Sequence, residues 1–123
     1  NYPVTGGVYS MAGGEIFISK LNDNLTTQLW STTIGGGGLS PTAFLVDNCG
    51  NIYSSSWGST TNLPLTPNAY DNVGGGKFYL CALTPDAGAL LYATYFGSGS
   101  GDHVDGGTCR FDKKGVVYES VCT

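Results

Sequence analysis

The 123-residue sequence is poor in charge, and above all in positive charge. Charged residues make up 11% of the chain, against about 25% in an average domain, and only five are Lys or Arg. These cations are scattered, so the sequence has no basic stripe that could follow a row of phosphates. The formal net charge is −4. We therefore expect no nucleic-acid partner.

Long apolar runs are also absent, and the start of the sequence does not have the pattern expected of a signal peptide. No run approaches the roughly 18 apolar residues that a membrane span needs. The opening Asn1-Tyr2-Pro3 resembles the interior of a folded unit rather than a leader. Low Lys content, abundant Gly and Asn, and the sequon Asn24-Leu25-Thr26 favour a secreted or cell-surface location. We expect a trimmed segment of a longer secreted chain, without a membrane span.

The four cysteines lack the CxxC spacing of zinc sites. Disulfides would allow three pairings, and the sequence does not choose among them. The cysteines are Cys49, Cys81, Cys109 and Cys122.

Glycine and aromatic residues are abundant, with 20 Gly and an aromatic content of 12%. Gly together with Tyr, Thr, Val and Phe is typical of short strands joined by tight turns. No stretch shows a sustained apolar period of 3.6 residues, so helix should be nearly absent. These features predict an all-β fold.

Four sequence blocks occur twice in the same order. The block that begins at Asn1 returns at Asn62. The other three blocks return at nearly the same spacing, and the small differences in spacing place the insertions in Gly-rich loops. These three pairs of blocks are 13–21 and 75–83, 29–35 and 91–97, and 46–53 and 111–118.

The complete copy contains four strand-like runs, predicted at Ala43–Asp47, Asn51–Trp57, Lys77–Leu83 and Ala89–Phe96. The first two flank Asn48-Cys49-Gly50, where Gly supplies the positive φ of a tight hairpin. The last two flank the turn residues 84–88.

Both faces of the run 78–83 are apolar, which is typical of a sheet covered on both sides. Four-stranded antiparallel sheets packed radially are the blades of a β-propeller. We predict about two blades: residues 1–42 as the second half of one blade, 43–96 as a complete blade, and 97–123 as the first half of the next. Since propellers use roughly four to eight blades, the partner should be the rest of a longer chain or neighbouring copies.

The repeat resembles the SBBP-type bacterial β-propeller repeat, and the resemblance covers nearly the whole chain. The matching segments are Asn62–Tyr70, Gly75–Leu83, Leu91–Gly97, and Asp47–Tyr53 with its copy Asp112–Tyr118. The resemblance implies a large secreted or surface-attached bacterial protein of the kind linked to type IX secretion or gliding motility. The chain departs from the pattern at Gly6, where the second copy has Pro67, and in its four cysteines, which point to disulfides of its own.

The loop 97–107 is the polar cluster most suited to chemistry. Asp102 and Asp105, with loop carbonyls, could bind calcium, which prefers flexible oxygen ligands. The favoured alternative is a connection between blades in which Asp accepts backbone hydrogen bonds, because the equivalent loop 35–41 has no carboxylate. His103 could act as a general base, but no activated nucleophile accompanies it, and we expect no enzyme.

Trp57 is the favoured aromatic candidate for stacking on a sugar, because its counterpart in the repeat is Cys122 rather than another aromatic residue. The other aromatic side chains, which recur, should pack between blades. The sequence thus predicts a non-catalytic structural or interaction segment of a surface propeller, acting in adhesion or surface assembly. The alternatives are a carbohydrate-binding module, an accessory part of a larger exoenzyme, and a filament protein whose open edges pair between chains.

Overall fold

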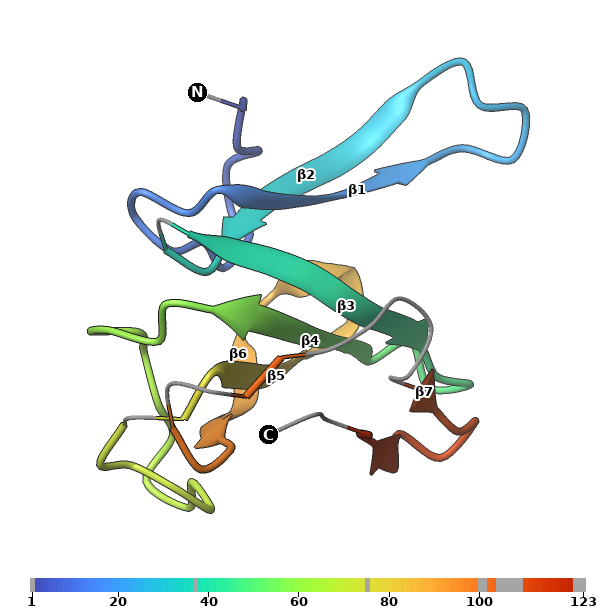
Figure 1. The fold of residues 1–123 in the computed structure, drawn as a ribbon. Coiled ribbons are helices and arrows are strands. Elements are labelled where there is room, and N and C mark those ends of the chain that lie inside the picture. The colour runs from blue at the N-terminus through green and yellow to red at the C-terminus, as the bar shows by residue number, and fades with distance from the viewer. Residues whose placement is uncertain (1, 37, 75, 100–101, 104–109, 121–123) are drawn as a thin grey trace.

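A computed structural model of the chain describes residues 2–36, 38–74, 76–99, 102–103 and 110–120. These residues form three antiparallel sheets, which confirms the predicted all-β class (Figure 1). The helical content of this part of the chain is one 3-10 turn, η1, Pro85–Ala87. No helix among the described residues is long and apolar enough to cross a membrane.

The middle sheet has four strands in the order β3-β4-β5-β6, and a two-stranded sheet precedes and follows it. None of the three sheets closes on itself within the described residues. The strands are β1 Ile16–Leu21 and β2 Gln28–Ile34 in the first sheet, β3 Leu39–Val46, β4 Ile52–Gly58, β5 Phe78–Leu83 and β6 Leu90–Phe96 in the second, and β7 Arg110–Phe111 and β8 Val117–Tyr118 in the third.

The four strands predicted for the complete copy are confirmed, and their boundaries agree to within one residue except at the start of the first. Strand β3 begins at Leu39, ahead of the expected start at Ala43. Pro41 lies inside it, next to a register shift between Pro41 and Ala43. Proline is tolerated there because β3 is an edge strand and the ladder needs no N–H donor at such an irregularity.

The sequence repeat is also a repeat of hydrogen-bond register. In β1–β2 Ile16 lies opposite Ile34, and in β5–β6 their counterparts Phe78 and Phe96 lie opposite each other. Both pairs of strands shift register at the same place, after Lys20 in β1 and after its counterpart in β5. Two copies of one sequence pattern therefore build the same irregular hairpin.

The segments that begin near Asn1 and Asn62 also take equivalent positions. The Thr5 N–H donates to the Ser31 carbonyl at 3.0 Å, and the Ser31 N–H donates to the Thr5 hydroxyl at 3.0 Å. Thr66 and Ala93, their counterparts, make the same two bonds at 3.3 and 3.1 Å. Each segment is thereby tied to the last strand of its own hairpin.

A single aspartate organises the turn of the β3–β4 hairpin and that of the β7–β8 hairpin. The Asp47 carboxylate accepts the N–H groups of Cys49 at 2.8 Å and Asn51 at 2.9 Å. Asp112, its counterpart in the next copy, accepts the equivalent N–H groups at 2.8 and 3.0 Å. Gly50 and Gly115 close the two turns with φ of 85° and 80°, which confirms the predicted positive φ.

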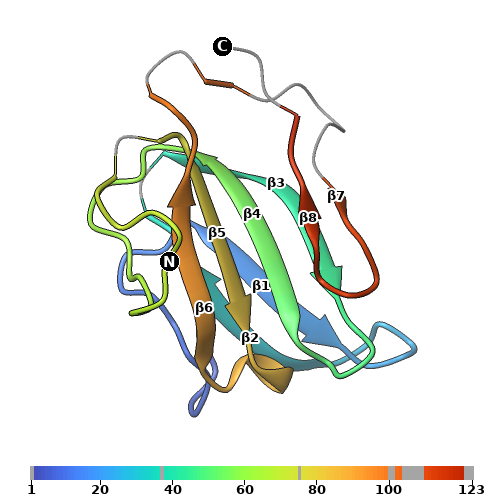
Figure 2. The ribbon, with the colours of Figure 1, turned by 90° about the horizontal axis from the view of Figure 1, so that it is seen from below.

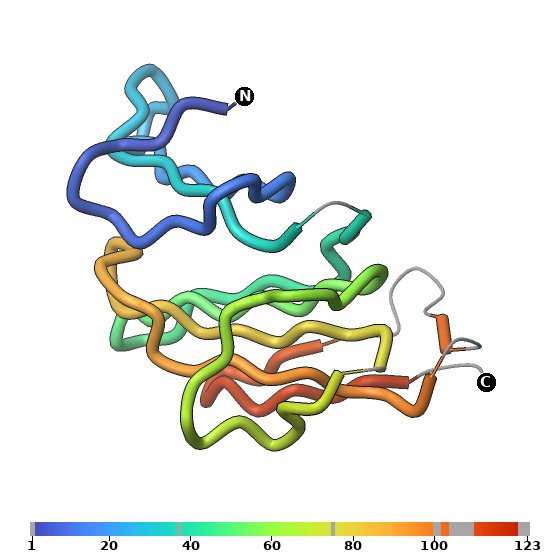
Figure 3. The backbone as a smooth tube through the Cα atoms, turned by 90° about the vertical axis from the view of Figure 1, so that its left-hand side faces the viewer, coloured from blue at the N-terminus to red at the C-terminus, as the bar shows by residue number. Residues whose placement is uncertain are grey.

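The hydrophobic core lies between the β1–β2 sheet and one face of the four-stranded sheet, and β7–β8 lies on the other face (Figure 3). Residues from both sheets interdigitate in it, including Ile18, Trp30 and Ile34 from the first and Tyr79 and Leu83 from the second. A polar link spans the layers at one end.

That link joins η1 to both strands of the first sheet. The Asp86 carboxylate accepts the Lys20 ammonium at 2.6 Å and the Trp30 indole N–H at 3.1 Å. The Lys20 hydrogen bond, followed by that of Trp30, lowers the pKa of Asp86. Side chains separated by 56 and 66 positions in the sequence thus hold two layers together.

Candidate functional site

An aromatic groove lies on the second face of the four-stranded sheet, between β5–β6 and β8. It has a volume of about 550 Å3. We define it by Tyr70, Leu80, Tyr92 and Phe96 on the sheet side and by Val117 and Tyr118 on the β8 side. Its apolar floor and tyrosine hydroxyls can take an aromatic or aliphatic side chain, or the face of a sugar ring.

The groove side chains are held in place by a few polar contacts. The Tyr92 hydroxyl accepts the Tyr70 N–H at 3.1 Å, and the rings of Tyr70 and Phe96 lie 6.3 Å apart. On the β8 side, the Ser55 hydroxyl donates to a carboxylate oxygen of Glu119. The groove is therefore preformed, yet Tyr70 remains 79% exposed.

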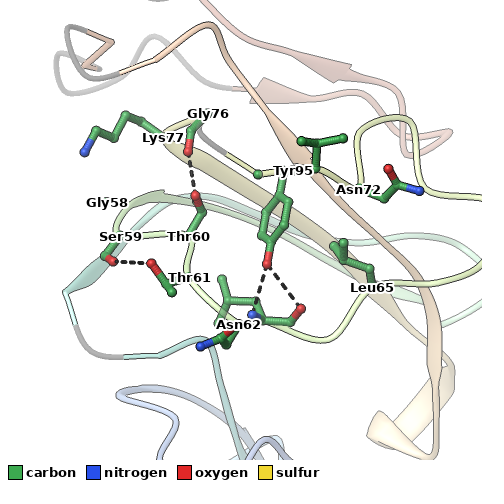
Figure 4. A pocket seen from close by; sticks show the side chains of 13 residues that line it. Gly58, Ser59, Thr60, Thr61, Asn62, Leu65, Asn72, Gly76, Lys77 and Tyr95 are labelled. Carbon is green, nitrogen blue, oxygen red and sulfur yellow. Dashed lines mark hydrogen bonds between the residues drawn. The ribbon is translucent and has the colours of Figure 1, made fainter.

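A second cavity, of about 540 Å3, opens beside the long loop between β4 and β5 (Figure 4). Hydroxyl and amide groups dominate its wall. The Thr60 hydroxyl donates to the Gly76 carbonyl at 2.6 Å, and the Tyr95 hydroxyl accepts the Leu63 N–H at 3.0 Å. Lys77 and Asn72 also line it. This cavity can bind a small polar molecule, but the described residues that line it include no carboxylate, histidine or cysteine for acid–base or nucleophilic chemistry.

Trp57 is half-buried in β4. It lies on the face that carries the aromatic groove, since it pairs with Phe78, which in turn pairs with Phe96 of the groove. Its indole N–H donates to the Asp102 carbonyl at 2.8 Å. The donor edge of this side chain is thus already bonded, and a sugar would have to stack on the part of the ring that stays exposed. The predicted role of Trp57 in ligand binding remains a prediction.

Asp102 is 3% exposed, and its carboxylate is surrounded by donors of its own loop. It accepts the Ser98 N–H, the Ser98 hydroxyl at 2.9 Å and the Gly99 N–H at 3.1 Å. The bond from the Ser98 backbone, followed by that of its hydroxyl, lowers the pKa of Asp102. This is the arrangement of a connecting loop stabilised by an aspartate.

The second residue of the predicted calcium site, Asp105, lies outside the described residues. The part of the chain that the structure describes contains no group of three or more His, Cys, Asp or Glu residues placed to hold a metal ion. Calcium binding therefore remains a prediction that depends on Asp105. His103 is exposed.

The described cysteines differ in exposure. Cys49 is exposed at the β3–β4 turn and Cys81 is buried in β5, and neither forms a disulfide within the described residues. Desolvation raises the pKa of the Cys81 thiol to about 12, so it is protonated at neutral pH and a poor nucleophile. Cys109 and Cys122 lie outside the described residues.

Sequence reasoning missed the aromatic groove, because it assigned Tyr70 and Tyr92 to packing between blades. No local pattern marks the groove, since recurrence alone predicts that equivalent residues are buried alike. Tyr9 and Trp30, the counterparts in the first copy, pack in or against the core, whereas Tyr70 and Tyr92 face the groove.

Comparison of the chain with protein-family models, with curated proteins and with solved structures found no match.

Proposed function

We propose that the chain is a non-catalytic structural or interaction segment of a large secreted or cell-surface β-propeller protein, acting in adhesion or surface assembly. The observation that carries this proposal is the repeat of hydrogen-bond register between β1–β2 and β5–β6. Copies that fold alike and stack face to face behave as units of an array, in which each unit depends on its neighbours.

The packing supports such an array. The first hairpin covers one face of the four-stranded sheet through a shared core, and β7–β8 begins to cover the other face. In a propeller, the four-stranded sheet from Leu39 to Phe96 would form a complete blade, and the segments before and after it would belong to its two neighbours. The resemblance to SBBP-type repeats is in keeping with this assignment and with an extracellular location.

An extended chain tests the proposal. A second copy of residues 1–36 is attached after Thr123 through the linker Ser59-Thr60-Thr61, which precedes the second repeat in the sequence. The added hairpin should cover the aromatic groove and raise the midpoint of urea unfolding.

The matched control carries Phe17→Asp and Leu21→Asp in the added copy alone, which places two charges against the apolar groove. The control should unfold at the midpoint of the unextended chain. Equal midpoints for the extension and its control would count against an array of stacked repeats.

Carbohydrate binding is the second candidate function, favoured by the exposed aromatic side chains of the groove. Tyrosine and tryptophan rings stack on the apolar faces of sugars. Binding to a glycan array that Trp57→Ala or Tyr70→Ala abolishes, with thermal unfolding unchanged, would support it. A glycan array without signal would remove it.

A further inference from the structure

The two repeats bury equivalent residues to different extents. Tyr79 in β5 is 1% exposed in the core, whereas its counterpart Phe17 in β1 is 54% exposed. The difference arises because β5 has the β1–β2 sheet on this face, whereas no sheet among the described residues covers the same face of β1. Tyr2 and Leu21, the counterparts of the buried Leu63 and Leu83, are exposed as well.

In the aromatic groove the second repeat is the exposed one, and the equivalent residues of the first repeat are buried. Ile34 is fully buried and Trp30 is 9% exposed in the core, and their counterparts Phe96 and Tyr92 line the open groove. In the first repeat, the face that carries Ile34 and Trp30 is covered by the four-stranded sheet. In the second repeat, the described residues supply the equivalents of β3 and β4 alone, as β7 and β8, so the region over β5 and β6 stays open (Figure 2).

Strands β8 and β1 each have one unpaired edge within the described residues, and their counterparts β4 and β5 pair with each other. In the four-stranded sheet, β4 and β5 pair along their full length. Their counterparts are β8 and β1, and within the described residues β8 pairs with β7 alone and β1 with β2 alone. Each of these strands therefore lacks the neighbour that its own counterpart has.

We propose that a second copy of this chain docks head to tail, with β1 of one copy adding to β8 of the other. The result is a four-stranded sheet in the order β7-β8-β1-β2. In the same step Tyr2, Phe17 and Leu21, here called the β1 surface, enter the aromatic groove. The inference deepens the proposed function, because it rests on the same repeat packing and names the partner.

The β4–β5 ladder predicts the register of the new pair. Ile52 lies opposite Leu83, and Tyr53 lies opposite Ala82. Translated to the counterparts, Val117 of one copy lies opposite Leu21 of the next, and Tyr118 lies opposite Lys20. Ile52 and Leu83, the counterparts of this pair, both lie in the core, so this register turns Leu21 toward the groove side chains rather than toward solvent.

The β1 surface is prepared for this contact. The rings of Tyr2 and Phe17 stack with their centroids 4.0 Å apart and an interplanar angle of 10°. The Tyr2 hydroxyl bonds to Gln28 at 3.0 Å, which fixes the outer ring. A rigid apolar plate of this kind loses little conformational entropy when it packs into a preformed groove.

The repeat also predicts a contact between β3 of one copy and β8 of the other. Phe111 in β7 packs against Tyr53 in β4 with ring centroids 5.8 Å apart. The counterpart of Phe111 is Val46, which is exposed at 51%. In the assembly Val46 packs against Tyr118 of the neighbouring copy, so the interface continues from the outer strands to the inner ones.

The two surfaces differ, so the interface is heterologous and each copy can use both ends. Such an interface closes into a ring if its rotation allows and otherwise extends as an open chain.

Sedimentation velocity over micromolar to millimolar concentrations tests the proposal. The wild-type chain should form oligomers as concentration rises. Phe17→Asp blocks the β1 surface and Tyr70→Asp blocks the groove, and each should weaken association by about tenfold or more. Both side chains are exposed, so the variants should fold, which far-UV circular dichroism and thermal unfolding verify. Val73→Asp is the control, because Val73 is exposed at 89% and does not line the aromatic groove.

Mixing the two blocked variants gives the decisive readout. Each alone has one intact surface and should be monomeric, whereas the equimolar mixture should form a one-to-one dimer and nothing larger. A wild-type chain that stays monomeric at every concentration overturns the inference, and so do oligomers that persist in both variants. If the extended chain of the previous section is nevertheless stabilised, the array proposal stands and only docking by a second copy fails.

Discussion

Equivalent truncations in the two repeats should have unequal effects on stability. Ile18 in β1 and Leu80 in β5 are counterparts in the repeated hairpin. Ile18 is 8% exposed in the core, and Leu80 is half-buried beside the aromatic groove. Ile18→Ala should lower the free energy of unfolding by about 3 kcal/mol, which combines lost burial with the cavity that remains.

Leu80→Ala should lower it by about 1–2 kcal/mol, because solvent already reaches one side of the side chain and can fill the vacated space. Urea unfolding followed by circular dichroism measures both values, at a concentration where sedimentation shows a monomer. The slope of free energy against urea should match the wild type, so that the midpoints report stability alone.

Equal losses at the two positions would refute the reasoning, since they would mean that the groove is as well covered as the core. A larger loss for Leu80→Ala would refute it more strongly. The comparison is internal to one chain, so a general effect of the denaturant or the buffer cannot produce the difference.

Three further predictions concern carboxylates, thiols and glycines. Folding lowers the pKa values of Asp47, Asp86 and Asp102, so the stability that these ionised groups add is present above their ordinary pKa of 3.8 and is lost as pH falls below it. The urea midpoint should therefore drop between pH 6 and pH 3, and an unchanged midpoint would contradict this. A thiol reagent should modify Cys49 quickly in the native protein but Cys81 only after unfolding, and peptide mapping would show which cysteine is labelled. Rapid labelling of Cys81 in the native protein would contradict this, since it would mean that β5 opens. Gly58→Ala should destabilise the fold by about 2 kcal/mol or more, because φ at Gly58 is 140° and the new Cβ would collide with the Gly38 carbonyl oxygen. In the control Gly6→Ala the new Cβ has nothing within 4 Å, so thermal unfolding should be nearly unchanged.

Local patterns predicted the strands well, because strand formation here depends on nearby residues. The turn at Asp47, with Gly50 at its end, could be read directly from the spacing of Asp and Gly, and so could its copy at Asp112. The start of β3 could not, since Pro41 argues against a strand unless the edge position and the irregular register are known.

The candidate sites were less predictable, because they depend on which faces are covered. Alternation in β5 shows that both faces are apolar, but it cannot tell that Tyr79 is buried while Leu80 borders an open groove. The link from Asp86 to Lys20 and Trp30 joins residues far apart in the sequence and leaves no local pattern. Asp102 was singled out, but its bonds to Ser98 depend on the path of the loop.

The aspartate-centred turns have a consequence for surface diversity. Asp47 and Asp112 accept backbone N–H groups in both turns, and Asp47 also accepts the side chains of Asn51 and Tyr53. The two residues that directly follow each aspartate contribute no side chain to these bonds. Those positions carry an amide and a thiol in one repeat, Asn48 and Cys49, and two ammonium groups in the other. Successive units can therefore vary the chemistry of their hairpin tips independently while the scaffold keeps the tips at regular intervals.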